Sequence, residues 1–406
     1  MLNSVEVKAR SLAQYVSVVG EEMVEAVRTL AAPLRGARVL HVNATAYGGG
    51  VAEILHWLVP LMRDVGLVAE WRVIGGSDEF FEVTKAMHNG LQGMDLPFTP
   101  EMQDLWRRTN EANARALKGE YDFLVVHDPQ PAGLLCFHGR EGGRHWIWRC
   151  HIDTSTPNPA FWEFLVPYLA PYDAYVFTMA EYLGPGLDRG KAAIIPPKID
   201  PLSPKNLPVP EEEQEAVLRR FGVDPTRPLL CQVSRFDPWK DPLGVIDAYR
   251  LVKEAIPGVQ LALVGSMAAD DPEGWTYYDR TLRHAGEDLD IVVLHNFHGV
   301  GDREVAAFQA AADVAIQKSL REGFGLVVSE ALWKGTPVVG GNVGGIRLQV
   351  LHGETGYLVD SVEDCAHRCL ELLRDPERAR AMGQAGRERV RRNFLSVHHL
   401  RDYLHL

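Results

Sequence analysis

The stretch ADVAIQKSLREGFGLVVSEALWKGTPVV, residues 312–339, contains a strand, a glycine loop, a short helix and a second strand. Residues 312–316 form an apolar run of strand length, and Gly323 and Gly325 permit a tight turn after it. Residues 326–334 are predicted as a helix that ends at the following glycine, before the next apolar run. Such a strand–helix–strand unit is typical of an α/β protein with parallel strands.

The same stretch combines a positive helix end with two carboxylates. The first free N–H groups of the predicted helix, at Leu326 and Val327, suit a phosphate. Glu322 lies in the loop before this helix, and Glu330 lies about one turn inside it. At that depth Glu330 is too far from the phosphate but within reach of a neighbouring ribose.

Length and composition are those of a globular protein with two domains. The chain has 406 residues, of which 46% are hydrophobic and 24% charged, with no apolar run of the roughly 18 residues that span a membrane. A formal charge of −12 argues against a general binder of nucleic acid or anionic membranes. The N-terminal residues lack the pattern of a secretory signal, so a cytoplasmic location is predicted. Five cysteines in mostly apolar contexts predict buried thiols, with no disulfide framework.

The remainder of the chain alternates between strands and helices on both sides of a proline-rich segment, residues 196–210. We therefore predict an α/β protein with two Rossmann-like, doubly wound domains: residues 1–205 and 206–389, with a C-terminal helix at about 390–406 packing back on the first domain. Strands are predicted at residues 38–43, 69–74, 123–128, 146–151, 174–177, 192–195, 229–233, 260–264 and 291–294.

Candidate ligand-binding residues of the first domain follow its predicted strands. Asn43 ends the first of them and leads to Gly48, Gly49 and Gly50, after which a helix begins. Backbone N–H groups at such a turn can approach a phosphate or a sugar, although a plain tight turn has the same pattern. His151 and Asp153 follow another strand, at the sheet edge where ligands collect in parallel α/β proteins. A lone histidine at such a position is more often structural.

Two cations follow the first strand of the second domain. Arg235 offers a planar fork and Lys240 a point charge, a pair that suits a diphosphate, although both could be solvated loop residues. Asp288 and Asp290 have the spacing of an Asp-x-Asp metal motif. They precede a strand instead of following one, so we interpret them as a solvated strand entry and predict no metal site.

These motifs carry a family resemblance. Glu322 and Glu330, separated by seven residues that begin with Gly-Phe-Gly, together with Ser234-Arg235 and Lys240, resemble the signature of the retaining GT-B glycosyltransferases of family 4. Residues 148–155, 317–325 and 342–347 are similar to those of the trehalose glycosyltransferring synthases and the related retaining trehalose phosphorylases. Many family members have proline where this chain has Lys318, and Pro-Glu where it has Arg347-Leu348. These departures favour the trehalose branch.

The resemblance implies two domains that face a cleft and a reversible transfer of glucose from a nucleoside diphosphate, UDP or ADP, to free glucose. The product would be an α,α-1,1 disaccharide, formed on the face from which the nucleotide leaves. It implies no required cofactor or metal, only small-molecule substrates as partners, and a possible homodimer. The implied catalytic residues are Glu322, Arg235, Lys240 and His151. The implied donor-binding residues are Gly49, Gly50, Arg235, Lys240, Phe324, Gly325, Leu326, Val327 and Glu330, and the acceptor-binding residues are Asp153, His151 and Asn43.

Three alternatives remain open at this level. A trehalose phosphorylase would place orthophosphate between Arg235, Lys240 and the helix that begins at Leu326. Glu330 favours a nucleotide, because a carboxylate placed to bind a ribose would have nothing to bind if the ligand were orthophosphate. Another family 4 glucosyltransferase would differ only in its acceptor. A non-catalytic sugar-nucleotide or carbohydrate binder is the third alternative. The presence of both Glu322 and Glu330, and of Arg235 and Lys240, argues against it.

Overall fold

The structure, a computed structural model, describes residues 2–267 and 272–406. The chain divides into two compact units. Unit 1 comprises Met1–Lys198 and Ser396–Leu406, and unit 2 comprises Ile199–Leu395. The sequence-based boundary after residue 205 lies within the loop that opens unit 2.

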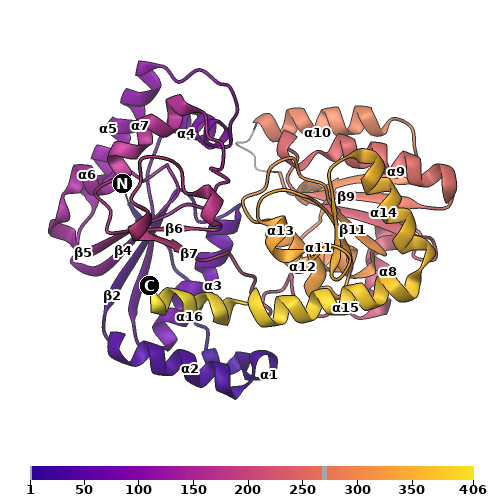
Figure 1. Cartoon of the computed structure of the whole chain (residues 1–406), viewed down its shortest axis with the longest axis horizontal. Helices are drawn as coiled ribbons and strands as arrows, with labels where there is room; N and C mark the ends of the chain where they lie inside the picture. Colours follow the sequence, from indigo (N-terminus) through magenta and orange to yellow (C-terminus); the bar gives the residue numbers. More distant parts are fainter. Residues whose placement is uncertain (1, 268–271) are drawn as a thin grey trace. The chain divides into compact units, whose positions relative to one another are not determined.

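Unit 1 is built on a seven-stranded sheet in the order β1-β3-β2-β4-β5-β6-β7. Figure 1 labels β2 and β4 to β7 of this sheet. All neighbours pair in parallel except β1 with β3. The two-residue strand β1 was not predicted, because it is too short to show any periodicity. The strands are β1 (Asn3–Ser4), β2 (Arg38–Asn43), β3 (Val68–Val73), β4 (Tyr121–His127), β5 (Gly143–Arg149), β6 (Ala174–Phe177) and β7 (Ala192–Ile194).

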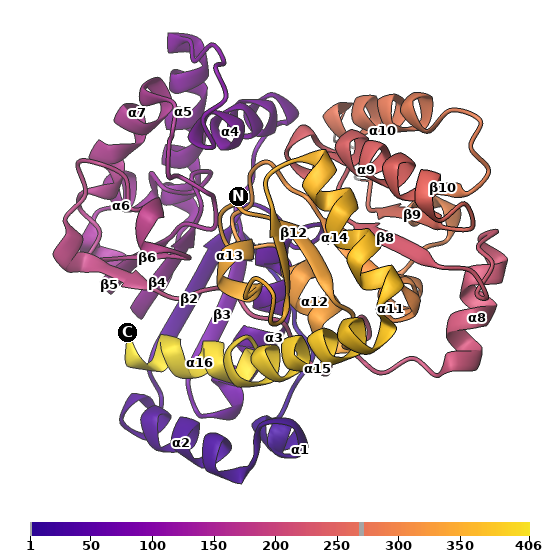
Figure 2. The ribbon, with the colours of Figure 1, turned by 45° about the vertical axis from the view of Figure 1, so that its right-hand side comes forward.

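Helices cover this sheet, and the last of them comes from the end of the chain. Helix α16 packs against α2 and α3, as Figure 2 shows. Two helices begin at capping side chains followed by proline: Thr99 caps α5 and Asn158 caps α7. The α-helices of unit 1 are α1 (Val16–Val19), α2 (Glu21–Ala31), α3 (Gly50–Asp64), α4 (Asp78–Leu91), α5 (Pro100–Ala116), α6 (Leu134–His138), α7 (Pro159–Leu169) and α16 (Ser396–His405).

Unit 2 has a six-stranded, wholly parallel sheet in the order β10-β9-β8-β11-β12-β13. Its strands are β8 (Leu229–Val233), β9 (Gln260–Gly265), β10 (Ile291–His295), β11 (Val314–Gln317), β12 (Val338–Gly341) and β13 (Gly356–Val359). Its α-helices are α8 (Glu211–Arg220), α9 (Pro242–Ala255), α10 (Pro272–Ala285), α11 (Asp302–Ala311), α12 (Leu326–Lys334), α13 (Ile346–Gln349), α14 (Val362–Arg374) and α15 (Pro376–Asn393).

Both faces of the second sheet are buried, which explains its continuous apolar strands. Leu230 and Leu261 point into a core shared with α9 and α14, whereas Cys231 and Ala262 point into a core shared with α8 and α11. Successive residues of a strand face opposite sides, so a sheet covered by helices on both sides needs apolar residues at every position. The predicted α/β architecture with two doubly wound sheets is therefore confirmed.

The strand order of each sheet also indicates where a ligand would bind. Connections leave in opposite directions from β2 and β4 in unit 1, and from β8 and β11 in unit 2. In open α/β sheets, ligands bind outside the carboxyl ends of strands at such a switch point. The predicted site residues lie at the end of β2, in the loops after β2, β8 and β11, or in the helices that follow these loops, with the exception of His151 and Asp153, which come after β5, the neighbour of β4.

Most predicted bounds of helices and strands are within two residues of those in the structure. The differences at the ends of β4 and β5 move two side chains from predicted strands into loops. Strand β4 ends at His127 and β5 ends at Arg149, so Asp128 and His151 lie in loops. Among the described residues, none of the helices is long and apolar enough to cross a membrane. Four of the five cysteines are buried, and Cys136 is exposed, contrary to the expectation for this thiol.

Candidate active site

The loop between β11 and α12 forms the centre of the candidate site in unit 2. Gly325 precedes α12 in a left-handed conformation, with a φ of 80°, which glycine adopts without steric cost. A Cβ atom at Gly325 would also lie 3.1 Å from Cγ of Glu322. The turn therefore folds the Glu322 side chain against the start of α12, whose first N–H groups belong to Leu326 and Val327.

Glu322 and Lys240 form an ion pair in this loop. Nζ of Lys240 lies 2.6 Å from Oε2 of Glu322, and the side chains are only 15% and 8% exposed. The hydroxyl of Ser319 donates to the same Oε2 at 3.2 Å. Lys240 is held in place by its backbone, because its N–H donates to Asp237 and its carbonyl accepts from Gln232. The structure therefore brings together two of the predicted catalytic residues, 82 positions apart in the chain.

Two further ion pairs place more cations near the carboxyl ends of β8 and β11. Arg235 is half-exposed and lies 3.1 Å from the buried carboxylate of Asp237. Lys318 pairs with Asp241, which also caps α9 and has a φ of 49°. Sequence reasoning missed both aspartates, although an aspartate before proline at a helix start is a recognisable cap signal.

Gln349 fastens the glycine loop to its surroundings. This fully buried side chain donates to the carbonyls of Phe324 at 2.5 Å and of Gly325 and Gly345 at 3.2 Å. Its Oε1 accepts from the hydroxyl of Ser329 on α12 at 2.5 Å. One side chain thus joins the loop, the helix after it and the turn at residues 344–345. Sequence reasoning did not find Gln349, because nothing in its neighbourhood marks it.

The turn at residues 344–345 presses its backbone against the glycine loop. A Cβ atom at Gly345 would lie 2.4 Å from Cα of Phe324 and 2.7 Å from the carbonyl oxygen of Gly323. The N–H of Gly345 donates to the carbonyl of Glu322 at 3.1 Å. Only glycine fits at this position, and the contact positions the backbone that carries Glu322.

Glu330 lies inside unit 2 and has a partner that was not predicted. Its side chain is fully buried, and Oε1 lies 2.7 Å from Nζ of Lys205. Oε2 of Glu330 has no hydrogen-bond partner among the described residues. Lys205 belongs to the proline-rich segment, so this pair joins that segment to α12. A buried carboxylate oxygen without a donor is an open position for a hydroxyl group.

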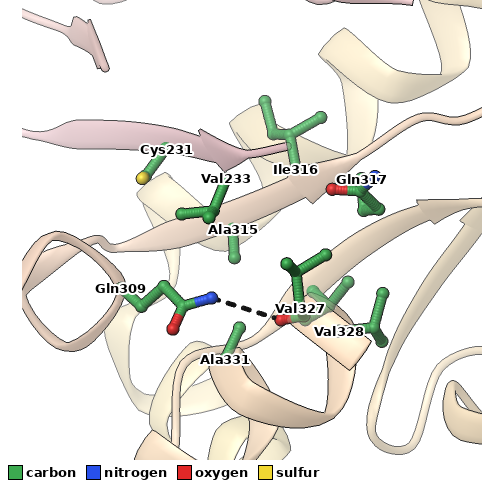
Figure 3. A pocket seen from close by; sticks show the side chains of 10 residues that line it. Cys231, Val233, Gln309, Ala315, Ile316, Gln317, Val327, Val328 and Ala331 are labelled. Atoms are coloured by element: carbon green, nitrogen blue, oxygen red, sulfur yellow. Dashed lines mark hydrogen bonds between the residues drawn. The ribbon is translucent and has the colours of Figure 1, made fainter. Parts of the chain in front are cut away.

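A small cavity beside the start of α12 is not a substrate site. Its volume is about 10 Å³, room for one water molecule at most, and apolar side chains form much of its wall (Figure 3). Nε2 of Gln309 donates to the carbonyl of Val327 at 3.3 Å, and Oε1 of Gln309 has no hydrogen-bond partner in the described part of the chain.

In unit 1, His151 lies at the end of a row of histidines. Its Nε2 lies 3.0 Å from Nδ1 of His127, whose Nε2 lies 3.0 Å from Nδ1 of His41. Burial lowers the pKa of His151 and of His127 well below the usual range, and lowers the pKa of His41 to about 3. All three rings are therefore neutral at pH 7. The sequence marked only His151.

Asp128 stands beside His151 in a strained backbone conformation. Its φ is 64°, uncommon for a residue other than glycine, and its Oδ1 accepts from the N–H of His151 at 2.7 Å. Burial raises the pKa of Asp128 to about 7, opposed by the N–H of His151 and the charge of Arg149. Strain of this kind gathers at functional sites. An acid at the end of a buried strand was the sequence signal, and it was not used.

Arg149 ends β5 as a fully buried cation. None of its three guanidinium nitrogens has a hydrogen-bond partner among the described residues, and burial lowers the pKa of Arg149. The carboxyl group of Asp128 opposes this lowering of the pKa. Burial and, in addition, the charge of Arg149 lower the pKa of the nearby Lys198. A cation held in this way adds positive potential behind His151.

Two of the three predicted acceptor residues, Asn43 and Asp153, are buried. Oδ1 of Asn43 accepts from Trp71 at 2.7 Å, and its Nδ2 donates to the carbonyl of Thr45 at 2.7 Å. Both polar ends of Asn43 thus hold the strand and loop around it. Oδ1 of Asp153 accepts from the N–H and the hydroxyl of Ser155, at 3.1 and 2.6 Å. The structure places both at the carboxyl edge of the sheet.

A second glycine-rich loop, residues 48–50 before and at the start of α3, has open space around it. A Cβ atom at Gly48 or Gly49 would meet no heavy atom within 4 Å, and Gly50 is the first residue of α3. Tyr47 is 77% exposed. This loop leaves room for a ligand to approach the N-terminus of α3.

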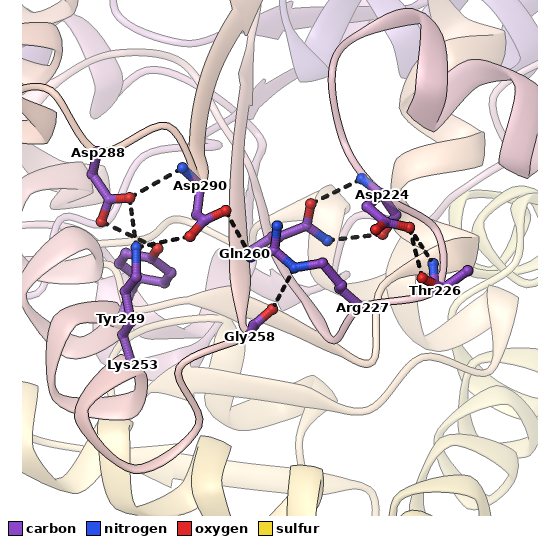
Figure 4. Close-up of polar contacts among 9 residues, drawn as sticks. All are labelled: Asp224, Thr226, Arg227, Tyr249, Lys253, Gly258, Gln260, Asp288 and Asp290. Carbon is purple, nitrogen blue, oxygen red and sulfur yellow. Dashed lines mark hydrogen bonds and ion pairs between the residues drawn. The ribbon is translucent and has the colours of Figure 1, made fainter.

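Asp288 and Asp290, outside both candidate sites, bind cations of the chain. Lys253 lies 2.6 Å from Asp288 and 2.9 Å from Asp290, and Arg227 lies 2.6 Å from Asp290 (Figure 4). Among the described residues, no group of three or more acidic, histidine or cysteine side chains could hold a metal ion. The pair of acids is thus an ion-paired strand entry instead of the solvated one that was predicted.

Known structures share this fold. A structure described as trehalose-6-phosphate from E. coli bound with UDP-2-fluoro glucose has a TM-score of 0.71 at 14% identity, over 91% of this chain and 98% of that chain. Two doubly wound parallel sheets of this kind define the class: the protein has the GT-B glycosyltransferase fold.

Sequence comparison gives the family within that class. Residues 41–184 match the family described as "Trehalose synthase, N-terminal domain", and residues 213–389 match "Glycosyl transferases group 1". The chain is 54% identical to a trehalose synthase of Rubrobacter xylanophilus, over 100% of this chain and 98% of that protein. A trehalose phosphorylase of Grifola frondosa is 30% identical, over 93% of this chain and 58% of that protein. The chain belongs to the trehalose synthase family of glycosyltransferases, which confirms the resemblance.

Proposed function

We propose that the protein transfers glucose from a nucleoside diphosphate to free glucose, reversibly and with retention, and so forms the α,α-1,1 disaccharide trehalose. The observation that carries the proposal is the Lys240–Glu322 pair in the loops beside the N-terminus of α12. It joins a cation for the leaving phosphate to a carboxylate for the sugar. The 54% identity to a trehalose synthase supports the choice of product.

Departure of the nucleotide leaves negative charge on the β-phosphate. Arg235, Lys240 and the first N–H groups of α12 are the groups that would stabilise this charge as it grows. Arg235 and Lys240 are each paired with an acid of the chain. A bound diphosphate would share these cations with Asp237 and Glu322, and Phe324 and Gly325 would line the donor with their backbone.

Retention by same-face transfer requires no nucleophile from the protein. The bond between C1 of the glucose and the β-phosphate oxygen breaks, and the bond from C1 to the acceptor oxygen forms on the same face. The proton of the acceptor hydroxyl passes to the leaving phosphate. Glu322 would bind the hydroxyls of the donor sugar, an interaction that strengthens as charge develops on the ring.

Unit 1 supplies the remaining contacts in this proposal. Gly49, Gly50 and His151 would line the reacting sugar, and Asp153 and Asn43 would lie on the acceptor side. Asp128 joins this set because its Oδ1 holds the backbone of His151. The open space at Gly48 and Gly49 supports the placement of a ligand at this loop.

Glu330 would bind a ribose hydroxyl of the donor. Its buried Oε2 has no donor among the described residues, while Oε1 is paired with Lys205. A ribose hydroxyl would satisfy the open oxygen. This assignment favours a nucleotide over orthophosphate, and the higher identity to a trehalose synthase points the same way.

A donor panel tests the proposal. The protein is incubated with free glucose and UDP-, ADP- or GDP-glucose, and in parallel with trehalose and either a nucleoside diphosphate or orthophosphate. We expect trehalose from UDP- or ADP-glucose, and the nucleotide sugar in the reverse direction. Glucose 1-phosphate formed from trehalose and orthophosphate alone would instead establish a phosphorylase.

Two further proposals are a homodimer, which rests on the resemblance alone, and a cytoplasmic location, which rests on the sequence pattern alone. Light scattering after size-exclusion chromatography tests the first, and a monomeric mass would contradict it. Fractionation of the source cells tests the second.

A further inference from the structure

A row of four side chains leads from the interior of unit 1 to His151. It begins at Met62 on α3, passes through His41 on β2 and His127 on β4, and ends at His151 after β5. Nε2 of His41 lies 3.5 Å from Sδ of Met62, and the two histidine–histidine contacts that follow are both 3.0 Å. His41 and His127 are buried, at 0% and 1% exposure. Each nitrogen of these two rings therefore has one partner, inside the protein.

The sulfur of Met62 determines where the first proton lies. A thioether accepts hydrogen bonds weakly and donates none, so only a protonated Nε2 of His41 makes a favourable contact with Sδ. The opposite tautomer would turn a buried lone pair toward the sulfur and leave it without a donor. Neutral His41 with a proton on Nε2 has a bare Nδ1, which accepts.

The remaining protons follow, since each neutral ring carries one. The bare Nδ1 of His41 accepts from Nε2–H of His127, which leaves Nδ1 of His127 bare. That nitrogen accepts from Nε2–H of His151. Nδ1 of His151 then carries no proton, so it can accept a hydrogen bond from a ligand.

The ring of His151 is also fixed in orientation. The rings of His127 and His151 are nearly parallel, with planes at 16° and centroids 5.3 Å apart, so the hydrogen bond between their nitrogens lies close to both ring planes. The backbone N–H of His151 donates to Oδ1 of Asp128 at 2.7 Å. Tautomer, ring plane and backbone are thus all set from within unit 1.

We propose that His127, His41 and Met62 are positioning residues that hold His151 in one tautomer, so that its Nδ1 accepts a hydrogen bond from a hydroxyl of the bound sugar. The inference rests on the proposed function for its ligand class, a polyhydroxylated sugar, whose hydroxyls can donate. A ring in the other tautomer would present an N–H to the same place and would select for an acceptor there. His151 would then require a different orientation of the substrate hydroxyl.

Nitrogen NMR on the full chain tests the tautomer without any substrate. The protein is labelled with ¹⁵N in its histidine rings, and His151 is assigned by its loss in His151→Gln. We expect the signals of a neutral ring with protonated Nε2 and bare Nδ1. A ring protonated at Nδ1 overturns the proposal. Because this readout needs no turnover, it stands even if the donor or the acceptor proves to be different.

Met62→Leu is the sharpest variant, because it removes the sulfur at nearly constant volume and lies two histidines away from His151. We expect the spectrum of His151 to show both tautomers, and kcat to fall several-fold with unchanged affinity for the nucleoside diphosphate. Unchanged spectrum and unchanged kcat would overturn the role of the row.

His127 offers a matched pair of variants. His127→Leu removes the acceptor for Nε2–H of His151, whereas His127→Asn places an amide oxygen near the position of Nδ1. We expect kcat to fall roughly ten- to a hundredfold in His127→Leu and to recover at least in part in His127→Asn, when both variants have native thermal midpoints. Equal losses in the two variants would overturn the proposal. If His127→Leu does not fold, the comparison of His127→Asn with Met62→Leu decides the question.

Discussion

Glu322→Gln separates the two functions that meet at the Lys240–Glu322 pair. The substitution keeps the shape of the side chain and removes its charge. In the structure, Oε2 of Glu322 accepts from Lys240 at 2.6 Å and from Ser319 at 3.2 Å, and an amide oxygen can accept from both. The fold of the loop should therefore survive, while the carboxylate that meets the sugar is lost.

The magnitude follows from the kind of interaction removed. Loss of one preorganised contact that acts in the transition state costs about 2.7–4 kcal/mol, and each 1.36 kcal/mol is a factor of ten in rate. We therefore expect kcat to fall by at least roughly a hundredfold. Affinity for the nucleoside diphosphate should stay within a few-fold or tighten, because Lys240 loses a competing partner but keeps its charge.

Lys240→Gln is the matched control. It removes the cation from the phosphate side of the same pair, so both nucleotide affinity and kcat should fall. Isothermal calorimetry with UDP and with ADP gives the affinity, and steady-state kinetics gives kcat. A loss of nucleotide affinity in Glu322→Gln that matches the loss of rate would contradict a contact between Glu322 and the sugar, since Glu322 would then act only by holding Lys240.

Three further outcomes follow from contacts in the structure. Gln349→Met removes the amide that donates to the carbonyls of Phe324, Gly325 and Gly345, so we expect kcat to fall and the free energy of unfolding to decrease by about 1–3 kcal/mol. An unchanged thermal midpoint and an unchanged kcat would contradict the role of Gln349 in holding the loop. Glu330→Gln should raise KM for the nucleotide sugar, whereas Lys205→Met should raise this KM and also lower the thermal midpoint, because it leaves the buried carboxylate unpaired. Equal changes of KM and of thermal midpoint in the two variants would make Glu330 a structural partner only. Asp128 keeps its proton in the folded state up to about pH 7, because its pKa is raised there to about 7, whereas in the unfolded chain it loses the proton near pH 4. The free energy of unfolding should therefore fall as the pH rises from 5 to 7, by up to about 3 kcal/mol. In Asp128→Asn this contribution disappears, and thermal midpoints of both proteins across pH 5–8 measure the difference; parallel curves would contradict the raised pKa.

The fold could be read from local patterns because its strands and helices are strongly marked. The predicted helix 326–334 coincides with α12, and the predicted strands 38–43 and 229–233 coincide with β2 and β8. Apolar runs and glycine stops act over a few residues, so a sequence shows them directly. The two-residue strand β1 has no such pattern and was missed.

The candidate site was predicted only where a residue type and a strand end coincide. Lys240 and Glu322 were found separately, but their contact joins positions 82 residues apart and depends on the order of β8 and β11 in the sheet. Lys205, Gln349 and His127 act through partners on other elements, so their own neighbours in the sequence do not mark them. Pairwise contacts across a fold require the packed structure.

The most direct test of the proposed reaction is an NMR measurement of the product. The protein is mixed with UDP-glucose or ADP-glucose and with glucose labelled by ¹³C at C1, in a buffer without phosphate. We expect a single new disaccharide in which both anomeric carbons are α, formed in step with free nucleoside diphosphate. A product with a β-configured donor carbon, or no disaccharide from any nucleotide sugar, would contradict the proposed reaction.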